Sequence, residues 1–431
     1  MPSIAPPDIC PRGGENVGGV PVEPGSAFSR RQTLFIAVAW CINVLAYSIV
    51  YPFLPIYLHV NRGIPMSTVG LIFPVMGLAA IVGSPLSGWL ADHAGRRVLL
   101  IGGPLGRSGA FFLLAWMAAV QAPFGWFVIG LFFASLLGKF FQNAANAYIT
   151  DMLPPDERLS AFNKVHVGAN IGWMVGPAVG AFLARMPYSL MFTITALCCV
   201  GTGAITWFFC PTISPGRGKQ RPTHQPPSQA LLRVLCDDRR MVALVALTLC
   251  LLLSVSQFAT TLSVYATETV GISKTSLGFL YTINGALVIL FLLPVNEVLK
   301  QWNIFMRIGC GALLYTVAFI GFGWSSTWLH LAICMAVMTA GEMLSLTAIL
   351  TAVSEIAPPD MIGRYMGVHG LVDGLGWAIG PYIGALLFEQ FQGQGLLLWA
   401  LLSVFSSVAG VGFFTMIRYW QRAPSSRKAL G

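Results

Sequence analysis

The sequence predicts an all-α membrane protein with twelve transmembrane helices in two pseudo-symmetric six-helix bundles. Of its 431 residues, 56% are hydrophobic and only 10% are charged, whereas a soluble domain carries about 25% charged residues. Apolar runs of about 20 residues, long enough to cross a hydrocarbon core as helices, recur through most of the chain. The second half of the chain also repeats motifs of the first half in the same order.

Breaks at proline, glycine and charged residues divide the apolar region into candidate spans. The twelve spans are expected near 33–58, 67–91, 98–120, 124–150, 160–185, 188–210, 241–267, 275–299, 304–323, 327–354, 362–388 and 395–418. Residues 1–32 lack an apolar core, so we expect a disordered cytoplasmic tail and not a signal peptide. The bundles then occupy 33–210 and 241–418, separated by a cytoplasmic linker at 211–240 and followed by a cytoplasmic tail at 419–431.

The distribution of basic residues predicts the orientation. With both termini in the cytoplasm, 19 of the 25 Lys and Arg residues fall in cytoplasmic tails and loops, which follows the positive-inside rule. Three others are expected outside and three within helices: Arg62, Arg185 and Lys274, then Arg107, Lys139 and Lys164. We therefore expect a multi-pass protein of the cell (inner) membrane, embedded in the lipid bilayer.

Several functions are excluded by what the sequence lacks. The basic residues are scattered over short loops, so nucleic acid is not expected as a partner. Nine cysteines form no CxxC pair and no Cys/His cluster with metal-ligand spacing. There is no Walker loop and no credible pair of nucleophile and base. We expect no enzyme, no cofactor and no metal site.

The two halves are related at a constant offset of 204 residues. Three groups match: Pro154-Pro155-Asp156 with Pro358-Pro359-Asp360, Gly172-Trp173 with Gly376-Trp377, and Gly176-Pro177 and Gly180 with Gly380-Pro381 and Gly384. A weaker match aligns Arg107 and Gly109 with Arg307 and Gly309. A parallel repeat of two six-helix halves is typical of one large class of membrane transporters.

The loop after the second span carries Gly88-Trp89-Leu90-Ala91-Asp92-His93-Ala94-Gly95-Arg96-Arg97, which resembles the GxLaDrxGrk signature of the major facilitator superfamily. Asp151, at the end of span four, matches the family's partner for the loop arginine. The resemblance implies a cytoplasmic latch made by Gly88, Asp92, Gly95, Arg96, Arg97 and Asp151. We expect Gly88 to let helices approach and Gly95 to permit a tight turn.

This latch departs from the family pattern in two places. His93 stands where the family usually has arginine, and the second-half counterpart at 296–300 is degenerate. Both departures predict a latch that is weaker or more dependent on pH. In the alternative interpretation, Arg96 and Arg97 only enforce the positive-inside topology.

Span five carries Gly168, Gly172, Gly176, Pro177 and Gly180, which resembles the GxxxGPxxGG antiporter signature of the twelve-helix drug:proton antiporters (multidrug exporters) in this superfamily. The end of span one, with Pro52 and Pro55, is similar to the same exporters. The resemblance implies efflux by a monomer. In the alternative interpretation, the small residues only allow close helix packing, and the near copy in span eleven supports that. Span four lacks the arginine of the family's RxxqG motif.

Three ionisable residues are expected near the midplane: Lys139, Glu342 and Asp373. Charged groups at this depth are costly and usually face a cavity or a partner. We expect an ion pair between Lys139 and either Glu342 or Asp373, and proton coupling at Asp373 first and Glu342 second. The alternative is a permanent salt bridge with no role in transport.

Polar residues at helical spacing predict the lining of a central substrate cavity. They are Asn43 and Tyr47 on span one, Lys139, Asn143 and Asn146 on span four, Gln257 and Tyr265 on span seven, and Tyr281 and Asn284 on span eight. Any of them could instead make hydrogen bonds between helices.

These features favour a secondary exporter of small organic or drug-like molecules that is driven by proton entry. The partners would be a small-molecule substrate and protons. The alternative is an uptake carrier or facilitator for a specific metabolite. A membrane receptor or scaffold without transport is a third hypothesis, but it would need neither the midplane carboxylates nor the antiporter motif.

Overall fold

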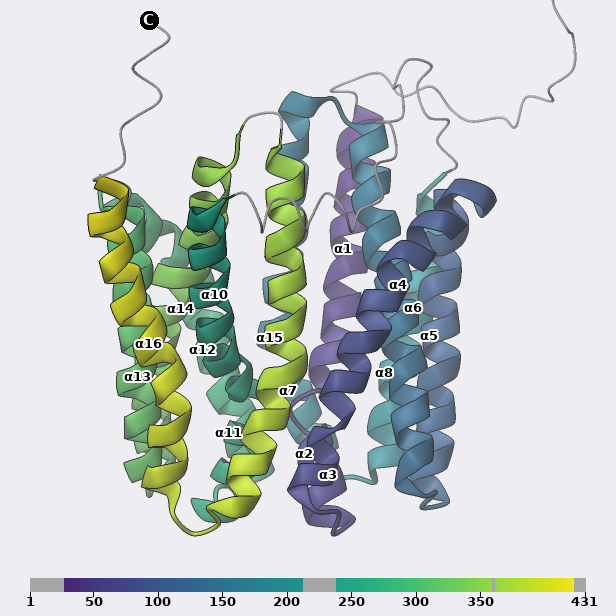
Figure 1. The fold of residues 1–431 in the computed structure, drawn as a ribbon. Helices are drawn as coiled ribbons and strands as arrows, with labels where there is room; N and C mark the ends of the chain where they lie inside the picture. The colour runs from purple at the N-terminus through teal and green to yellow at the C-terminus, as the bar shows by residue number, and fades with distance from the viewer. Residues whose placement is uncertain (1–26, 212–237, 359–360, 422–431) are drawn as a thin grey trace, which may run out of the picture.

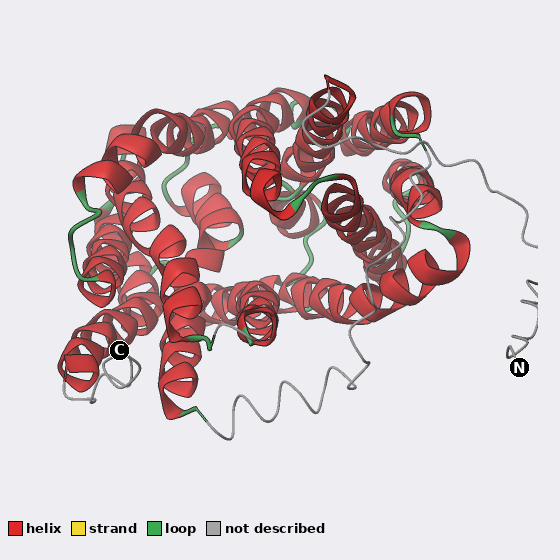
Figure 2. Ribbon diagram, turned by 90° about the horizontal axis from the view of Figure 1, so that it is seen from above, coloured by secondary structure: helices red, strands yellow, loops and turns green. Residues whose placement is uncertain are grey.

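The computed structural model describes residues 27–211, 238–358 and 361–421. Helices and short connections make up these residues, and no strand occurs among them (Figure 2). The first residues of the first helix and the last residues of the last helix lie at the same end of the molecule, at the top of Figure 1. We call this end the terminal face and the other end the opposite face.

The first half, on the right of Figure 1, contains the spans predicted from the amino-terminal part of the sequence. Its helices are α1 (Ala27–Val50), α2 (Leu54–Ile56), the π-helical turn η1 (Tyr57–Asn61), α3 (Met66–Gly70), α4 (Ile72–Ala94), α5 (Arg96–Ala119), α6 (Phe124–Met152), α7 (Pro155–Leu183) and α8 (Tyr188–Phe209).

The second half repeats this arrangement. Its helices are α10 (Arg239–Val255), the 3₁₀ turn η2 (Ser256–Ala259), α11 (Thr261–Val264), the π-helical turn η3 (Tyr265–Thr269), α12 (Lys274–Val298), α13 (Ile304–Trp324), α14 (Trp328–Ile356), α15 (Ile362–Gln390) and α16 (Gly395–Gln421). All twelve predicted spans are therefore helical, and their number and order are confirmed.

Eleven of the described helical segments are long and apolar enough to cross a membrane. The twelfth, α7, has 29 residues but is more polar, with Glu157, Arg158 and Lys164 in its first half. It packs between α1 of its own half and α12 of the other half, so neighbouring helices cover much of its surface.

The predicted boundaries between spans and tails are wrong by a few residues. Helix α1 begins at Ala27, so residues 27–32 of the expected tail are helical. Helix α10 begins at Arg239, inside the expected linker, because the Asp238 side chain caps it by accepting from the backbone N–H groups of Arg240 (2.9 Å) and Met241 (3.3 Å). Helix α16 continues to Gln421. The rest of the expected tails and linker, and Pro359 and Asp360 of the repeat, lie outside the described residues.

The first span of each half is broken near the opposite face. In the first half, α1 ends just before Pro52, which has no N–H to continue the helix. In the second half, the break at η2 contains no proline. The Gln257 amide instead donates to the carbonyls of Leu253 (2.8 Å) and Gly380 (2.7 Å). Both spans then end in π-helical turns, at η1 and η3.

The glycines of α7 and α15 pack closely against the first helix of each half, α1 and α10. A Cβ added at Gly172 would lie 2.8 Å from the Cys41 carbonyl oxygen of α1, and one at Gly376 would contact Leu252 of α10. The Ser48 hydroxyl donates to the Gly172 carbonyl oxygen (2.9 Å). The two glycine rows are therefore equivalent packing seams in the two halves.

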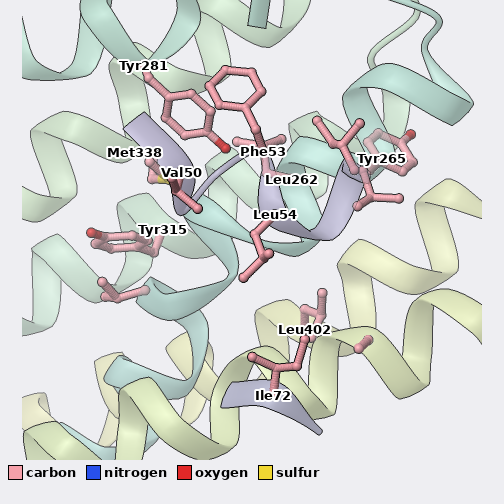
Figure 3. Packing of buried hydrophobic residues seen from close by; sticks show 14 of the residues in the cluster. Val50, Phe53, Leu54, Ile72, Leu262, Tyr265, Tyr281, Tyr315, Met338 and Leu402 are labelled. Atoms are coloured by element: carbon pink, nitrogen blue, oxygen red, sulfur yellow. The ribbon is translucent and has the colours of Figure 1, made fainter. Parts of the chain in front are cut away.

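A buried apolar cluster fills each half and continues between the broken spans near the opposite face. Figure 3 shows part of it: Phe53 and Leu54 from the first half lie near Leu262 and Tyr281 from the second. The described hydrogen bonds and ion pair between the halves also lie from the middle of the molecule toward this face. They include His59 with Glu268 (3.3 Å) and the Ser67 N–H with Glu389 (2.6 Å).

Candidate functional site

A cavity of about 440 Å³ lies between the two halves, near the middle of the bundle. This volume is within the usual range for small-molecule sites. Helices α1, α4, α5, α6 and α7 of the first half line it, and α15 is the contribution of the second half. Three charged residues face it: Arg107 of α5, Lys139 of α6 and Asp373 of α15.

Arg107 is almost completely buried, with 5% of its surface exposed. Its Nη1 donates to Asn43 Oδ1 at 3.1 Å, and its guanidinium lies over the rings of Tyr47 (5.8 Å) and Phe111 (5.5 Å). Its Nε and the Nδ2 of Asn43 are buried without a hydrogen-bond acceptor. The guanidinium passes over Gly138 of α6, where a Cβ would lie 3.2 Å from Arg107 Cζ.

The sequence placed Arg107 within a helix but did not assign it to the site. Two signals pointed to it: it was one of three cations expected within helices, and it matched Arg307 in the repeat. The structure shows that the matched residues differ, because Arg307 bonds within the second half, to Asn296 and to the Thr347 hydroxyl (3.0 Å).

The expected ion pair of Lys139 does not form. Lys139 Nζ instead donates to Gln142 Oε1, one turn along the same helix, at 3.1 Å. Lys139 and Asp373 share the cavity, and Asp373 has no hydrogen-bond or ion-pair partner among the described residues. The prediction failed because sequence depth places both charges near the midplane but does not fix their separation across the cavity.

Glu342, the second predicted carboxylate, is at a similar depth but does not line this cavity. Its Oε2 accepts a hydrogen bond from Asn284 Nδ2 at 2.9 Å, and the same amide donates to the Thr339 hydroxyl (2.9 Å). These contacts lie between α12 and α14, within the second half. The expected pair between Glu342 and Lys139 is therefore also absent.

Aromatic side chains line the part of the cavity nearer the opposite face. Tyr51 lies at their centre, with ring centroids 5.7 Å from Phe73, 6.3 Å from Trp173 and 6.5 Å from Trp377. The Tyr47 ring is tilted by 31° against that of Tyr51, with the ring centroids 4.6 Å apart. Trp173 and Trp377 are the residues that the sequence repeat paired, so the two halves contribute equivalent rings to the cavity.

Of the nine residues predicted for the cavity, Asn43, Tyr47 and Lys139 line it. The other six, which are not among its lining residues, are Asn143, Asn146, Gln257, Tyr265, Tyr281 and Asn284. Most of these six make hydrogen bonds elsewhere. Asn143 donates to the Ser87 hydroxyl (2.7 Å), Tyr281 to the Phe258 carbonyl (2.7 Å) and Tyr265 to the Gly323 carbonyl (3.4 Å). Asn146 is exposed.

The predicted latch residues lie at the terminal face, where α4 meets α5. Arg96 forms an ion pair with Asp151 of α6 and donates to the Ala147 carbonyl (2.7 Å). Arg97 donates to the carbonyls of Cys210 and Trp207, both at 2.9 Å. These contacts fasten α5 to α6 and to the end of α8, all within the first half.

Two glycines of the latch motif have different environments. Gly95 has φ +90°, so it makes the tight turn that the sequence predicts. A Cβ at Gly88 would meet no atom within 4 Å, so the expectation of a close helix approach there is wrong in this conformation. The Asp92 side chain lies outside what the structure describes.

The antiporter-motif residues lie on α7 between two helices. Gly168, Gly172, Gly176 and Gly180 face α1, and a Cβ at Gly176 would overlap Ser48. On the other side of α7, the Pro177 carbonyl faces Gly278 of α12 in the other half. Close packing therefore accounts for the spacing of these glycines in the structure.

Two related six-helix bundles around a charged cavity within the membrane define a transporter. The model of the Major Facilitator Superfamily matches residues 36–381 and 258–430. The chain belongs to the Major Facilitator Superfamily.

Relatives and solved structures agree with this family. The chain is 25% identical to the uncharacterized transporter YqjV of Bacillus subtilis, over 85% of this chain and 90% of YqjV. It is also 25% identical to the multidrug resistance protein MdtH of Klebsiella pneumoniae, over 92% of this chain and 95% of MdtH. A bacterial homolog of the lysosomal transporter Spinster, solved in an inward-facing conformation, shares the fold with a TM-score of 0.75 and 15% identity, covering 93% of this chain and 100% of that one.

Proposed function

We propose that this transporter is a proton-coupled exporter of small organic molecules that works by alternating access. The similarity to MdtH, which is named a multidrug resistance protein, supports export. The observation that carries proton coupling is the position of Asp373. Its carboxylate is the charge that the second half contributes to the cavity, and it has no hydrogen-bond or ion-pair partner among the described residues. It faces a wall with two cations, and it interacts electrostatically with Lys139 on that wall and with His369 on its own helix.

The proposed cycle exchanges a proton for substrate at this cavity. A protonated Asp373 is neutral and no longer attracts Lys139 across the cavity. An ionised Asp373 does attract it, and so draws the two halves together. Substrate that occupies the space near Lys139 competes with the carboxylate for the positive charge. Proton and substrate thus each weaken the same attraction between the halves, so one can replace the other in the cycle.

We propose that the terminal face is cytoplasmic and the opposite face external, as the distribution of basic residues predicts. The described contacts between the halves lie from the middle of the molecule toward the opposite face. Under this orientation they would close the external side. Arg96 and Asp151 would then belong to a cytoplasmic latch in which the Asp151 pair holds the loop arginine in place.

Transport by two carboxylate variants tests the coupling. Asp373→Asn and Glu342→Gln would each be reconstituted in vesicles with an imposed proton gradient, and transport measured with a panel of labelled anionic, neutral and cationic aromatic compounds. We expect Asp373→Asn to lose gradient-driven transport and to retain substrate binding without a gradient. We expect a smaller effect for Glu342→Gln, because Asn284 already satisfies that carboxylate within one half.

Glu355→Gln is the matched control, because Glu355 lies on the same helix as Glu342 but is exposed near its end. Full gradient-driven transport by Asp373→Asn, by Glu342→Gln and by the double variant would overturn proton coupling at these residues. The uptake carrier or facilitator would then become the better hypothesis.

A further inference from the structure

The central cavity carries more positive than negative charge. Arg107 and Lys139 lie on its first-half wall and Asp373 on its second-half wall. The two cations donate to neutral amide oxygens: Arg107 to Asn43 Oδ1 and Lys139 to Gln142 Oε1. Neither cation forms an ion pair with a described carboxylate. Charges at this depth are usually compensated by a partner or a ligand.

The same wall also holds two donors without acceptors. Arg107 Nε and Asn43 Nδ2 are buried and unpaired, although their residues are hydrogen-bonded to each other through other atoms. Buried donors without acceptors are rare and call for an explanation. A ligand with several acceptor oxygens would supply the missing hydrogen bonds and the missing negative charge together.

We propose that the substrate of this transporter is an aromatic organic anion, such as an aromatic carboxylate. This inference rests on the proposed transport function and names its substrate class. The carboxylate accepts hydrogen bonds from Arg107, Lys139 and Asn43, and charge-assisted bonds of this kind are the stronger ones. The ring packs among Tyr51, Trp173 and Trp377.

The charge balance also disfavours a lipophilic cation. Such a molecule would gain the attraction of Asp373 but would meet both Arg107 and Lys139 in a cavity of about 440 Å³. In a poorly hydrated cavity of this size, the repulsion between the ligand cation and these two side chains would be strong. An anion instead competes directly with Asp373 for Lys139, which is the exchange that coupling requires.

Equilibrium binding to the purified protein, without any gradient, tests the substrate charge. The probes are matched sets on naphthalene, indole and biphenyl rings, each with a carboxylate, a neutral carboxamide and an ammonium form, measured by isothermal titration. We expect the carboxylate of at least one ring system to bind roughly tenfold or more tightly than its carboxamide. We expect the ammonium forms to bind weakest.

Variants of Lys139 test whether the preference for carboxylates arises in this cavity. Lys139→Gln should weaken carboxylate binding by roughly tenfold and leave carboxamide binding unchanged, while Lys139→Arg should retain carboxylate binding. Asp373→Asn should keep or improve it. Lys164→Gln, which removes an exposed cation of α7 outside the cavity, should have no effect.

Three results would overturn the inference: tightest binding of the ammonium forms, no binding by any member of the panel, or carboxylate binding that Lys139→Gln leaves intact in a folded protein. These results are separate from failure of the proposed function. If carboxylates bind as expected but a proton gradient drives no transport, the substrate class stands and the coupling fails.

Discussion

At the scale of single residues, the cavity depends on the fit between Arg107 and Gly138. The long Arg107 side chain reaches the cavity from α5 because α6 presents no side chain where the guanidinium crosses it. Atoms of the guanidinium lie 3.2 to 3.4 Å from the position of a Cβ at Gly138. A larger residue at this position would therefore displace the cation or the helix.

We predict that Gly138→Val lowers the free energy of unfolding by about 1–3 kcal/mol, the usual cost of overpacking. It should also weaken binding of aromatic carboxylates, because the displaced guanidinium no longer faces them. Thermal denaturation in detergent measures the loss of stability, and isothermal titration calorimetry measures the weaker binding. The control is Gly109→Ala on α5, where a Cβ meets no atom within 4 Å and the gain in helix propensity should stabilise by about 0.5–1 kcal/mol. Unchanged stability and binding in Gly138→Val would show that this fit is not required.

The sequence could identify which residues lie at the depth of the cavity, but not which of them face it. Lys139, Asn43, Tyr47 and Asp373 line the cavity as predicted. Gln257 was predicted from the same helical spacing, but its side-chain amide donates to the Leu253 carbonyl of its own span and does not line the cavity. Arg107 was missed because helix periodicity does not show that a glycine on the neighbouring helix leaves room for it.

At the scale of elements, each broken first span needs side chains to satisfy its backbone. Within lipid, carbonyls released by a helix break must find donors inside the protein. Gln257 supplies one such bond at η2, to the Leu253 carbonyl, and a second bond to the Gly380 carbonyl of α15. Its Oε1 accepts from the Thr261 hydroxyl (2.6 Å). Tyr281 supplies another, to the Phe258 carbonyl. The polar residues of this region therefore stabilise a bend in the backbone.

We predict that Gln257→Leu lowers the free energy of unfolding by about 1–3 kcal/mol. The Gly380 carbonyl loses its bond to the Gln257 amide, and the Leu253 carbonyl keeps only the longer bond from the Ser256 hydroxyl (3.2 Å). Thermal denaturation in detergent measures this loss. Gln301→Leu, at an exposed position between α12 and α13, should change stability by less than about 0.5 kcal/mol. Equal stability of the two variants would contradict the role assigned to Gln257.

Span positions were predictable because a run of about 20 apolar residues has few other structures available. The breaks were less predictable. Pro52 indicates the first, but its counterpart at η2 has no proline and is stabilised by contacts from α12 and α15. Helix ends also depend on single hydrogen bonds such as the Asp238 cap, which hydropathy does not detect.

At the scale of the whole molecule, the sequence repeat predicted two related halves but not the conformation in which they meet. The repeat is visible in the structure of both halves because matched glycines make the same helix contact in each half. Gly172 packs against α1, and Gly376 packs against α10. Conformation is set by contacts between the halves, and these join residues that the sequence repeat does not match with each other. His59 with Glu268 and Lys274 with Tyr188 (3.0 Å) are examples.

The contacts at the opposite face provide a direct test of alternating access and of orientation. The Ser67 N–H donates to the Glu389 carboxylate across the two halves at 2.6 Å, so cysteines at both positions should be bridged by a disulfide or by a short crosslinker that attaches through disulfide bonds. We predict that the Ser67→Cys/Glu389→Cys protein, once crosslinked, loses at least about 90% of its transport because the opposite face can no longer open. Binding of substrate from the terminal face should persist.

An impermeant reductant added to intact cells should restore transport, because we propose that the opposite face is external. The control pair, Ser326→Cys/His330→Cys, lies at the same face but within one half, where the Ser326 hydroxyl and His330 Nδ1 are 3.4 Å apart. Its crosslink should leave transport unchanged. Transport at the normal rate by the crosslinked Ser67/Glu389 pair would show that the halves do not separate at this face. Restoration by reductant from the cytoplasmic side alone would reverse the proposed orientation, because the thiols would then face the cell interior.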